Sequence, residues 1–110
     1  MIARIWHGYT TKENADAYEN LLKHEIFGGI ANKKLSGYKG IQLLKREVDD
    51  EFEFTTIMWF ENMGGVKQFM GEEYETAYVL PQAQKLLKRY DRKSIHCELI
   101  HELKYDADAI

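Results

Sequence analysis

The chain of 110 residues carries 15 Lys and Arg against 18 Asp and Glu, for a formal net charge of −3, and 45% of its residues are hydrophobic. This length allows one hydrophobic core, and this composition excludes a disordered chain. The two charge signs are spread evenly, which leaves no basic surface for nucleic acid, and no apolar run is long enough to cross a membrane. One cysteine excludes an internal disulfide. We therefore expect a cytoplasmic globular protein that binds neither nucleic acid nor membranes.

The first quarter of the chain predicts a strand followed by a helix. Residues 2–10 (IARIWHGYT) are rich in β-branched and aromatic residues, which favour a strand. Apolar residues then recur every three or four positions from Ala15 to Ile26, which predicts a helix with one apolar face. The glycines at 28–29 are expected to weaken that helix near its end.

The rest of the chain predicts a hairpin, two helical stretches and a last strand. Residues 38–48 and 52–61 have strand character and are joined by a short acidic turn, which predicts the hairpin. Helical spacing returns over 62–79, and Pro81, a residue suited to the first turn of a helix, opens a further helical stretch. The last strand is expected at 94–103.

This order of elements, β-α-β-β-α-β, predicts the ferredoxin-like arrangement of the α+β class, with a four-stranded antiparallel sheet. That topology places the first and third strands in the middle, and both carry large apolar residues on their two faces. The fourth strand alternates between apolar and polar residues, as a less covered strand should. We expect one domain over residues 1–103 and a C-terminal tail at 104–110 without a recognisable pattern.

The two-sided apolar character of the central strands has a consequence for assembly. Helices can cover one face of a four-stranded sheet, and the chain contains no spare segment to cover the other face. A second copy of the same sheet is the simplest cover. The sequence therefore predicts a homodimer whose sheets meet face to face.

Five sequence runs resemble the antibiotic biosynthesis monooxygenase-like family. They are IxRxWHGxT at 2–10, GYxG at 37–40, EFxT at 53–56, MGEEYExA at 70–77 and LLKRYD at 86–91. The resemblance covers nearly the whole chain and implies the dimeric α/β-barrel version of the ferredoxin-like fold, in agreement with the predicted order of elements. The superfamily includes quinone-forming monooxygenases, haem-degrading enzymes and isomerases.

The resemblance implies an oxidoreductase of the monooxygenase type that works without a flavin, metal or other cofactor on a small aromatic or hydroquinone-like substrate. In such a reaction the substrate loses a proton and its anion reduces dioxygen, so the protein has to orient the substrate and stabilise the anion. The alternative is a non-catalytic dimeric small-molecule-binding or stress-associated module of the same fold. An open cavity reached by His7 or Tyr78 would favour the enzyme, and a core filled with side chains would favour the binding module.

The candidate site consists of a histidine and several aromatic residues. Trp6 and His7 are neighbours on the first strand, so their side chains point to opposite faces. We interpret His7 as the catalytic base, because imidazole titrates near neutral pH; the alternative is a half-buried histidine held by a carboxylate or a carbonyl. Five aromatic residues are expected to bind the substrate unless they only fill the core. They are Trp6, Trp59, Phe60, Tyr74 and Tyr78.

Neither a metal site nor a haem site is expected. His96 and Glu98 share one face of the last strand and, with His7 on the adjacent strand, would supply two histidines and a carboxylate, but a hydrogen-bonded cluster explains them better. The resemblance places other residues where the haem-degrading relatives carry an asparagine, a tryptophan and a haem-ligating histidine. These residues are Trp6, Phe60 and Tyr78.

Overall fold

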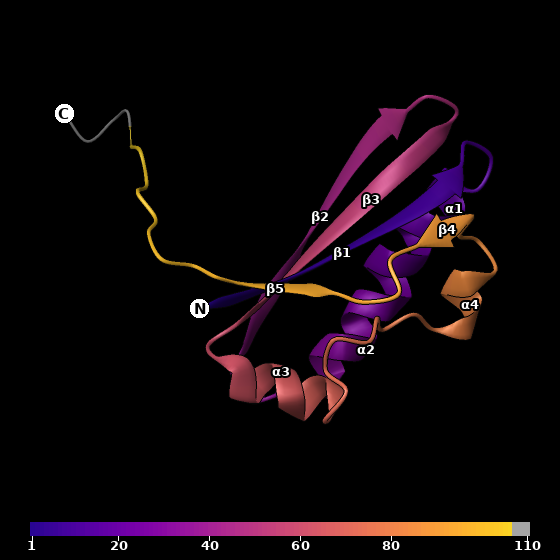
Figure 1. The fold of residues 1–110 in the computed structure, drawn as a ribbon. Helices are drawn as coiled ribbons and strands as arrows, with labels where there is room; N and C mark the ends of the chain where they lie inside the picture. Colours follow the sequence, from indigo (N-terminus) through magenta and orange to yellow (C-terminus); the bar gives the residue numbers. More distant parts are fainter. Residues whose placement is uncertain (107–110) are drawn as a thin grey trace.

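The computed structural model describes residues 1–106 and contains an antiparallel sheet with helices packed on one face (Figure 1). Its three long strands are β1 (Ile2–Thr11), β2 (Tyr38–Val48) and β3 (Glu51–Phe60). β3 lies between β1 and β2, and it pairs with β1 along the whole length of both strands. The predicted hairpin, the central places of the first and third strands and the α+β class are therefore confirmed.

Two short strands share the other edge of β1. β4 (Arg89–Tyr90) pairs with one half of β1, and β5 (Ile95–Glu98) pairs with the other half. Only β5 lies within the fourth strand predicted at 94–103, whereas β4 lies in the stretch after Pro81 that was predicted to be helical. The result is a five-stranded sheet that does not close into a barrel within the chain. Between β4 and β5, the side-chain carboxylate of Asp91, in place of a backbone carbonyl, accepts the N–H of His7 at 3.1 Å.

The last strand is also shorter than predicted. The periodicity indicated a strand over 94–103, whereas β5 ends at Glu98. The N–H of Leu99 donates to the carbonyl of Met1 at 2.9 Å, and within the described part of the chain this is the final backbone contact along that edge. Residues 99–106, which we call the C-terminal arm, then run away from the body of the molecule (Figure 1).

One long helical segment covers a face of the sheet. It consists of α1 (Ala15–Leu21), the π-helical turn η1 (Leu22–Ile26) and α2 (Phe27–Asn32). The predicted helix therefore forms, and it continues past the glycines at 28–29 because Ile26 and Ile30 on either side of them are buried in the core. Its apolar stripe packs against the sheet through five buried residues, Ala15, Tyr18, Leu22, Ile26 and Ile30.

The second helical region is interrupted, against the expectation of one helix over 62–79. α3 (Met63–Met70) begins where the side chain of Asn62 accepts the N–H of Gly65, and it ends at Gly71. Gly71 has a φ of 84°, a conformation that favours glycine and stops the helix. Residues 71–80, which we call the roof segment, then continue without regular structure.

Pro81 starts a helix as predicted, but α4 (Pro81–Gln84) has a single turn. The apolar spacing after Pro81 predicted a longer helix, but the chain instead pairs with the edge of β1. The N–H of Lys88 donates to the carbonyl of Tyr9 at 2.7 Å, and β4 begins at the next residue. Backbone groups at a sheet edge need partners, and this short strand supplies them.

Helices pack on one face of the sheet and leave the other face exposed. Arg4 and Trp6 point from β1 toward the helices, whereas Ile5 and His7 point to the other side, which we call the open face. No helix among the described residues covers the open face (Figure 1), and Ile95 on it is 55% exposed.

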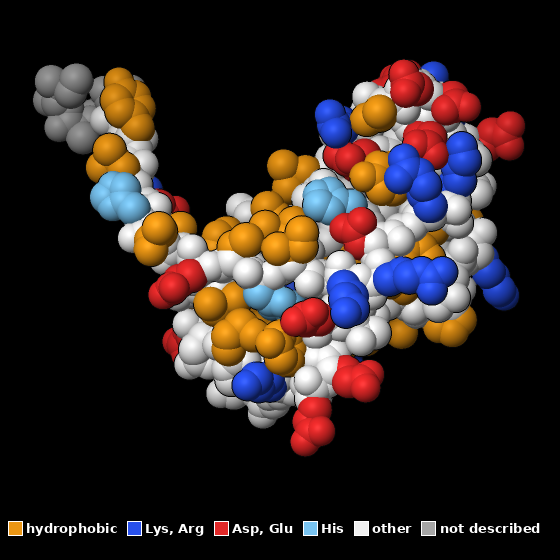
Figure 2. All heavy atoms as spheres, viewed as in Figure 1, with side chains coloured by type: hydrophobic (Ala, Val, Ile, Leu, Met, Phe, Trp, Pro, Cys, Tyr) orange, Lys and Arg blue, Asp and Glu red, His pale blue; other side chains and the backbone are white. Residues whose placement is uncertain are grey.

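The C-terminal arm also exposes hydrophobic side chains, which are visible along it in Figure 2. Three of its apolar or aromatic residues are between 85% and 88% exposed, and they are Ile100, Leu103 and Tyr105. Large apolar side chains on an extended segment are unusual for a chain that functions alone.

Candidate functional site

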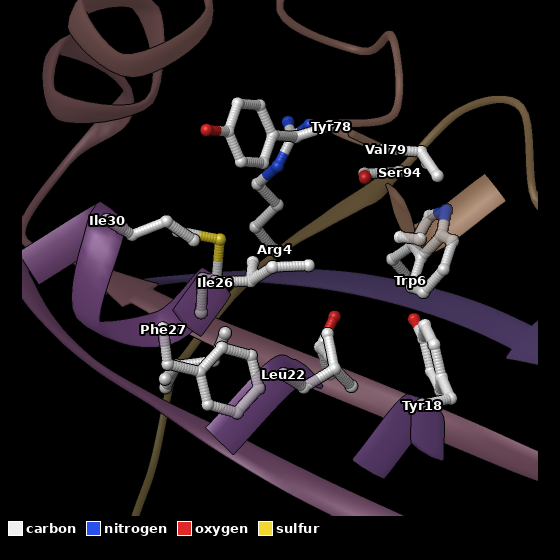
Figure 3. Close-up of a pocket in the computed structure, with 14 residues that line it drawn as sticks. Arg4, Trp6, Tyr18, Leu22, Ile26, Phe27, Ile30, Tyr78, Val79 and Ser94 are labelled. Carbon is white, nitrogen blue, oxygen red and sulfur yellow. The ribbon is translucent and has the colours of Figure 1, made fainter. Parts of the chain in front are cut away.

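A cavity lies between the helical layer and the sheet (Figure 3). Its volume is about 50 Å³. One water needs roughly 10–15 Å³, and pockets for drug-sized ligands measure roughly 300–1,000 Å³. A cavity of roughly 150 Å³ is enough to bind benzene, so this cavity has room for a few waters as it stands and has to widen before a one-ring ligand can enter.

The π-helical turn shapes one wall of this cavity. Leu22 and Ile26 are the first and last residues of η1, and both line the cavity. A π-helical turn inserts an extra residue into the helix and is found frequently at functional sites. From the sheet, Met58 closes the opposite wall. The lining is mainly apolar, as is usual for sites that bind flat organic molecules.

Trp6 occupies one end of the cavity, where Gly8 gives its ring room. A Cβ atom added to Gly8 would lie 2.5 Å from Cη2 of Trp6 and 2.9 Å from Cδ2 of Leu87. The indole Nε1 donates to the carbonyl of Asp91 at 2.8 Å, so the ring is held at its polar end as well. Trp6 is thereby presented as a fixed aromatic wall.

Arg4 is a buried cation in the wall of the cavity, and only 2% of it is exposed. Its guanidinium donates to two carbonyls of the roof segment, those of Tyr74 and, at 2.8 Å, Thr76. Its Nη1 also lies 2.9 Å from Nε2 of His96. Burial lowers the pKa of Arg4 to about 10, which still leaves the group charged at neutral pH.

The remaining polar groups of the cavity are hydroxyls. Tyr18 reaches it from α1, and Figure 3 shows its phenolic oxygen pointing toward Trp6. Burial raises the pKa of Tyr18, so this phenol stays neutral and can donate a hydrogen bond. Thr56 and Ser94 contribute smaller hydroxyl groups, and Tyr78 adds a second phenol from the roof segment.

The five predicted substrate-binding residues are not gathered in one place. Trp6 and Tyr78 line the cavity. Phe60 is 0% exposed and packs in the core against the rings of Tyr38 and Phe69, without lining the cavity.

The other two lie outside the cavity. The side chain of Tyr74 packs on the ring of His96, with the ring centres 5.5 Å apart, although its backbone carbonyl holds Arg4. Trp59 lies on the open face, where its Nε1 donates to Oε1 of Gln42 at 2.9 Å. Their proposed contacts with substrate therefore remain predictions for which this arrangement provides no support.

His7 lies on the open face, away from the cavity. Its Nδ1 is 2.7 Å from Oδ2 of Asp91, and about a third of each side chain is exposed (30% and 34%). A catalytic base has to come within hydrogen-bonding reach of the proton that it removes, and the sheet separates His7 from any ligand in the cavity. The catalytic role of His7 thus stays a prediction that its position does not support. Its contact with Asp91 matches the alternative, a histidine held by a carboxylate.

Arg4 is the residue that the sequence analysis did not single out. It shares its strand face with Ile2 and Trp6, so it lies among residues that pack toward the helices. A charged residue at a core-facing position of a central strand is rare without a partner or a role. The position of Arg4 on the same strand face as Ile2 and Trp6 could therefore have pointed to it from the sequence.

The three residues considered for a metal site do not converge. His96 lies opposite Arg4 on the helix-facing side, whereas His7 lies on the open face. Residues 1–106 contain no group of three potential metal-ligating side chains.

Within the same range no helix is both long and apolar enough to cross a bilayer.

Comparison with known proteins gives matches at the level of structure. Among them is the crystal structure of the Putative Antibiotic Biosynthesis Monooxygenase from Bacillus cereus, with a TM-score of 0.67 over 96% of this chain and 97% of that chain. The two sequences are 13% identical, so the likeness is one of fold. No family model and no curated protein matches the sequence. The chain therefore shares its α+β fold with a protein named as a monooxygenase.

Proposed function

We propose that the chain is a cofactor-independent oxidoreductase of the monooxygenase type that oxidises a small, one-ring hydroquinone-like phenol in the cavity. The observation that carries the proposal is the composition of that cavity, which combines apolar walls, the fixed ring of Trp6 and the buried charge of Arg4. The shared fold with a protein named as a monooxygenase supports the reaction class.

The proposed reaction needs no reductant other than the substrate. The bound phenol loses its proton, and the phenolate passes one electron to dioxygen. The resulting radical pair combines to form a carbon–oxygen bond at the ring. Loss of water from this hydroperoxide gives the quinone, so one oxygen atom enters the product and the other leaves as water. The substrate is oxidised by four electrons and dioxygen is reduced by four.

The cavity residues have separate tasks in this reaction. The ring of Trp6 stacks on the substrate, and its hydrogen bond to Asp91 keeps the stacking surface fixed. The phenols of Tyr18 and Tyr78 form polar-tipped walls that orient the substrate oxygens. The apolar remainder excludes water, which keeps the radical pair together.

We also propose that the protein is a homodimer in which the open faces of two sheets meet. Exposed apolar side chains on that face support this arrangement, with Leu44 51% and Ile95 55% exposed. The C-terminal arm adds Ile100 and Leu103, which a second copy would cover. His7 and Asp91 would then be interface residues.

A reducing compartment such as the cytoplasm is part of the same proposal. Cys97, the one cysteine of the chain, is a free and exposed thiol. Exposed thiols persist in reducing surroundings and oxidise elsewhere.

Oxygen uptake tests the proposed reaction. The protein is incubated with hydroquinone or methylhydroquinone under ¹⁸O₂ in the presence of a chelator, and autoxidation is measured with heat-denatured protein. We expect uptake well above autoxidation and a hydroxylated quinone that carries one labelled oxygen atom. Uptake no faster than autoxidation with both compounds would overturn the proposal and favour the non-catalytic binding module.

A further inference from the structure

Within residues 1–106, the hydrogen-bond partners of the Arg4 guanidinium are all neutral groups. Its guanidinium contacts the carbonyls of Tyr74 and Thr76 and the imidazole nitrogen of His96. His96 must be neutral in this contact, because a guanidinium can only donate and Nε2 therefore has to accept. Burial and the neighbouring Arg4 both lower the pKa of His96, which favours this neutral form.

In the described part of the chain, no carboxylate balances the charge of Arg4. Among residues 1–106, no Asp or Glu oxygen lies within 4.0 Å of its guanidinium. Glu75, on the roof segment, is 4.0 Å from Lys93 instead. A buried charge without a counter-ion is costly, and proteins usually pair such a group or leave its counter-charge to a ligand.

The guanidinium retains donors for a ligand. It carries five N–H groups, and the three contacts described above use three of them. Arg4 also lines the cavity, whose other walls are mainly apolar. The three groups that the guanidinium contacts do not themselves line the cavity. An anionic oxygen that reaches the remaining N–H groups from the cavity would meet an uncompensated positive charge in surroundings of low polarity, where the attraction is strong.

We propose that Arg4 is the anion-binding residue of the cavity, and that the ligand binds as an oxyanion, with its ionised phenol oxygen against the guanidinium. This inference rests on the proposed function for the class of ligand, a one-ring phenol. It assigns to Arg4 the stabilisation of the phenolate that has to form before dioxygen is reduced. The proton can then leave to solvent water during binding, and the cavity needs no catalytic histidine.

Titration of a chromophoric phenol tests the inference without any turnover. p-Nitrophenol absorbs at different wavelengths as phenol and as phenolate, so its ionisation can be followed while it is bound to the intact protein. We expect the pKa of the bound compound to fall by one unit or more below that of the free compound, which is about a tenfold preference for the phenolate. A bound pKa equal to or above the free value, or no binding at any pH, would overturn the inference.

Variants locate the effect. Arg4→Gln should abolish the shift, and Arg4→Lys should retain part of it because the charge stays. Arg46→Gln, which removes an exposed arginine on the open face, should leave the shift unchanged. A shift that survives in folded Arg4→Gln would contradict the assignment, and the wild-type titration decides the matter if that variant does not fold.

The two proposals can fail separately. A lowered pKa of bound p-nitrophenol without oxygen uptake would support the anion site and contradict the proposed monooxygenase activity. Oxygen uptake with an unshifted bound pKa would retain the activity and remove the role of Arg4.

Discussion

Arg4 and His96 lie directly opposite each other on β1 and β5, and the guanidinium Nη1 is 2.9 Å from the imidazole Nε2. The two strands therefore place the permanently charged guanidinium of Arg4 beside the imidazole of His96, which becomes a cation when it is protonated. Glu75 and the ring of Tyr74 are the other groups that face His96, and Glu75 favours its protonation only weakly compared with the opposing effects of burial and Arg4.

This pair predicts a pH dependence of stability. The pKa of His96 in the folded protein lies below its ordinary value of 6.5, so the unfolded chain binds the proton more readily. The stabilisation is therefore complete above about pH 6.5 and is lost as the pH falls toward the folded pKa. We expect the free energy of unfolding in urea to decrease from about pH 7 to pH 5, and to decrease less in His96→Gln. Equal slopes for the two proteins would contradict this account.

Gly8 is predicted to be essential for the position of Trp6. In Gly8→Ala the new methyl group would clash with the indole ring, whose Cη2 lies 2.5 Å from the added Cβ. We expect a loss of about 1–3 kcal/mol in unfolding free energy and a shift in Trp6 fluorescence. Gly28→Ala is the matched control, because nothing lies within 4 Å of its added Cβ. That change should stabilise the helix by about 0.4–1 kcal/mol.

The three long strands could be predicted from their β-branched and aromatic residues, and the two-sided apolar character of β1 and β3 indicated their central places. β4 could not be predicted, because it lies in a stretch with helical spacing. The helices after residue 62 could not, because apolar spacing of three to four residues persists through the roof segment while Gly71 ends α3. Trp6 and Tyr78, which line the cavity, could be proposed from residue type alone. The role of Arg4 depends on which strand face meets the helices, and periodicity does not determine that.

His7→Gln tests whether the open face takes part in the chemistry. The account places the reaction in the cavity, so kcat with a phenolic substrate should stay within about twofold of the wild-type value. Within a single protomer the contact with Asp91 is partly exposed, so its loss should lower the unfolding free energy of the monomer by no more than about 1 kcal/mol. A fall in kcat of about 10²-fold or more in a folded variant would instead support His7 as the base.

Ile5→Lys tests the proposed dimer. Ile5 lies on the open face opposite Ile57 of β3 and Ile95 of β5, so a charge there would be buried between the two sheets. Light scattering should give twice 12.9 kDa for the wild type and the monomer mass for the variant. Ala31→Lys, on the exposed side of α2, should leave the dimer intact. A monomer mass for the wild type at micromolar concentration would contradict the proposed homodimer.

The most direct test of the central claim, that the cavity is the site of reaction, is to fill it. Ala83 lines the cavity and is 2% exposed, so Ala83→Leu would place three further carbon atoms there. Ala31→Leu makes the same change on the exposed side of α2. With oxygen uptake from methylhydroquinone as the measurement, we expect Ala83→Leu to lower the rate at least tenfold and Ala31→Leu to leave it unchanged. A folded Ala83→Leu protein that consumes oxygen at the wild-type rate would show that the reaction takes place elsewhere.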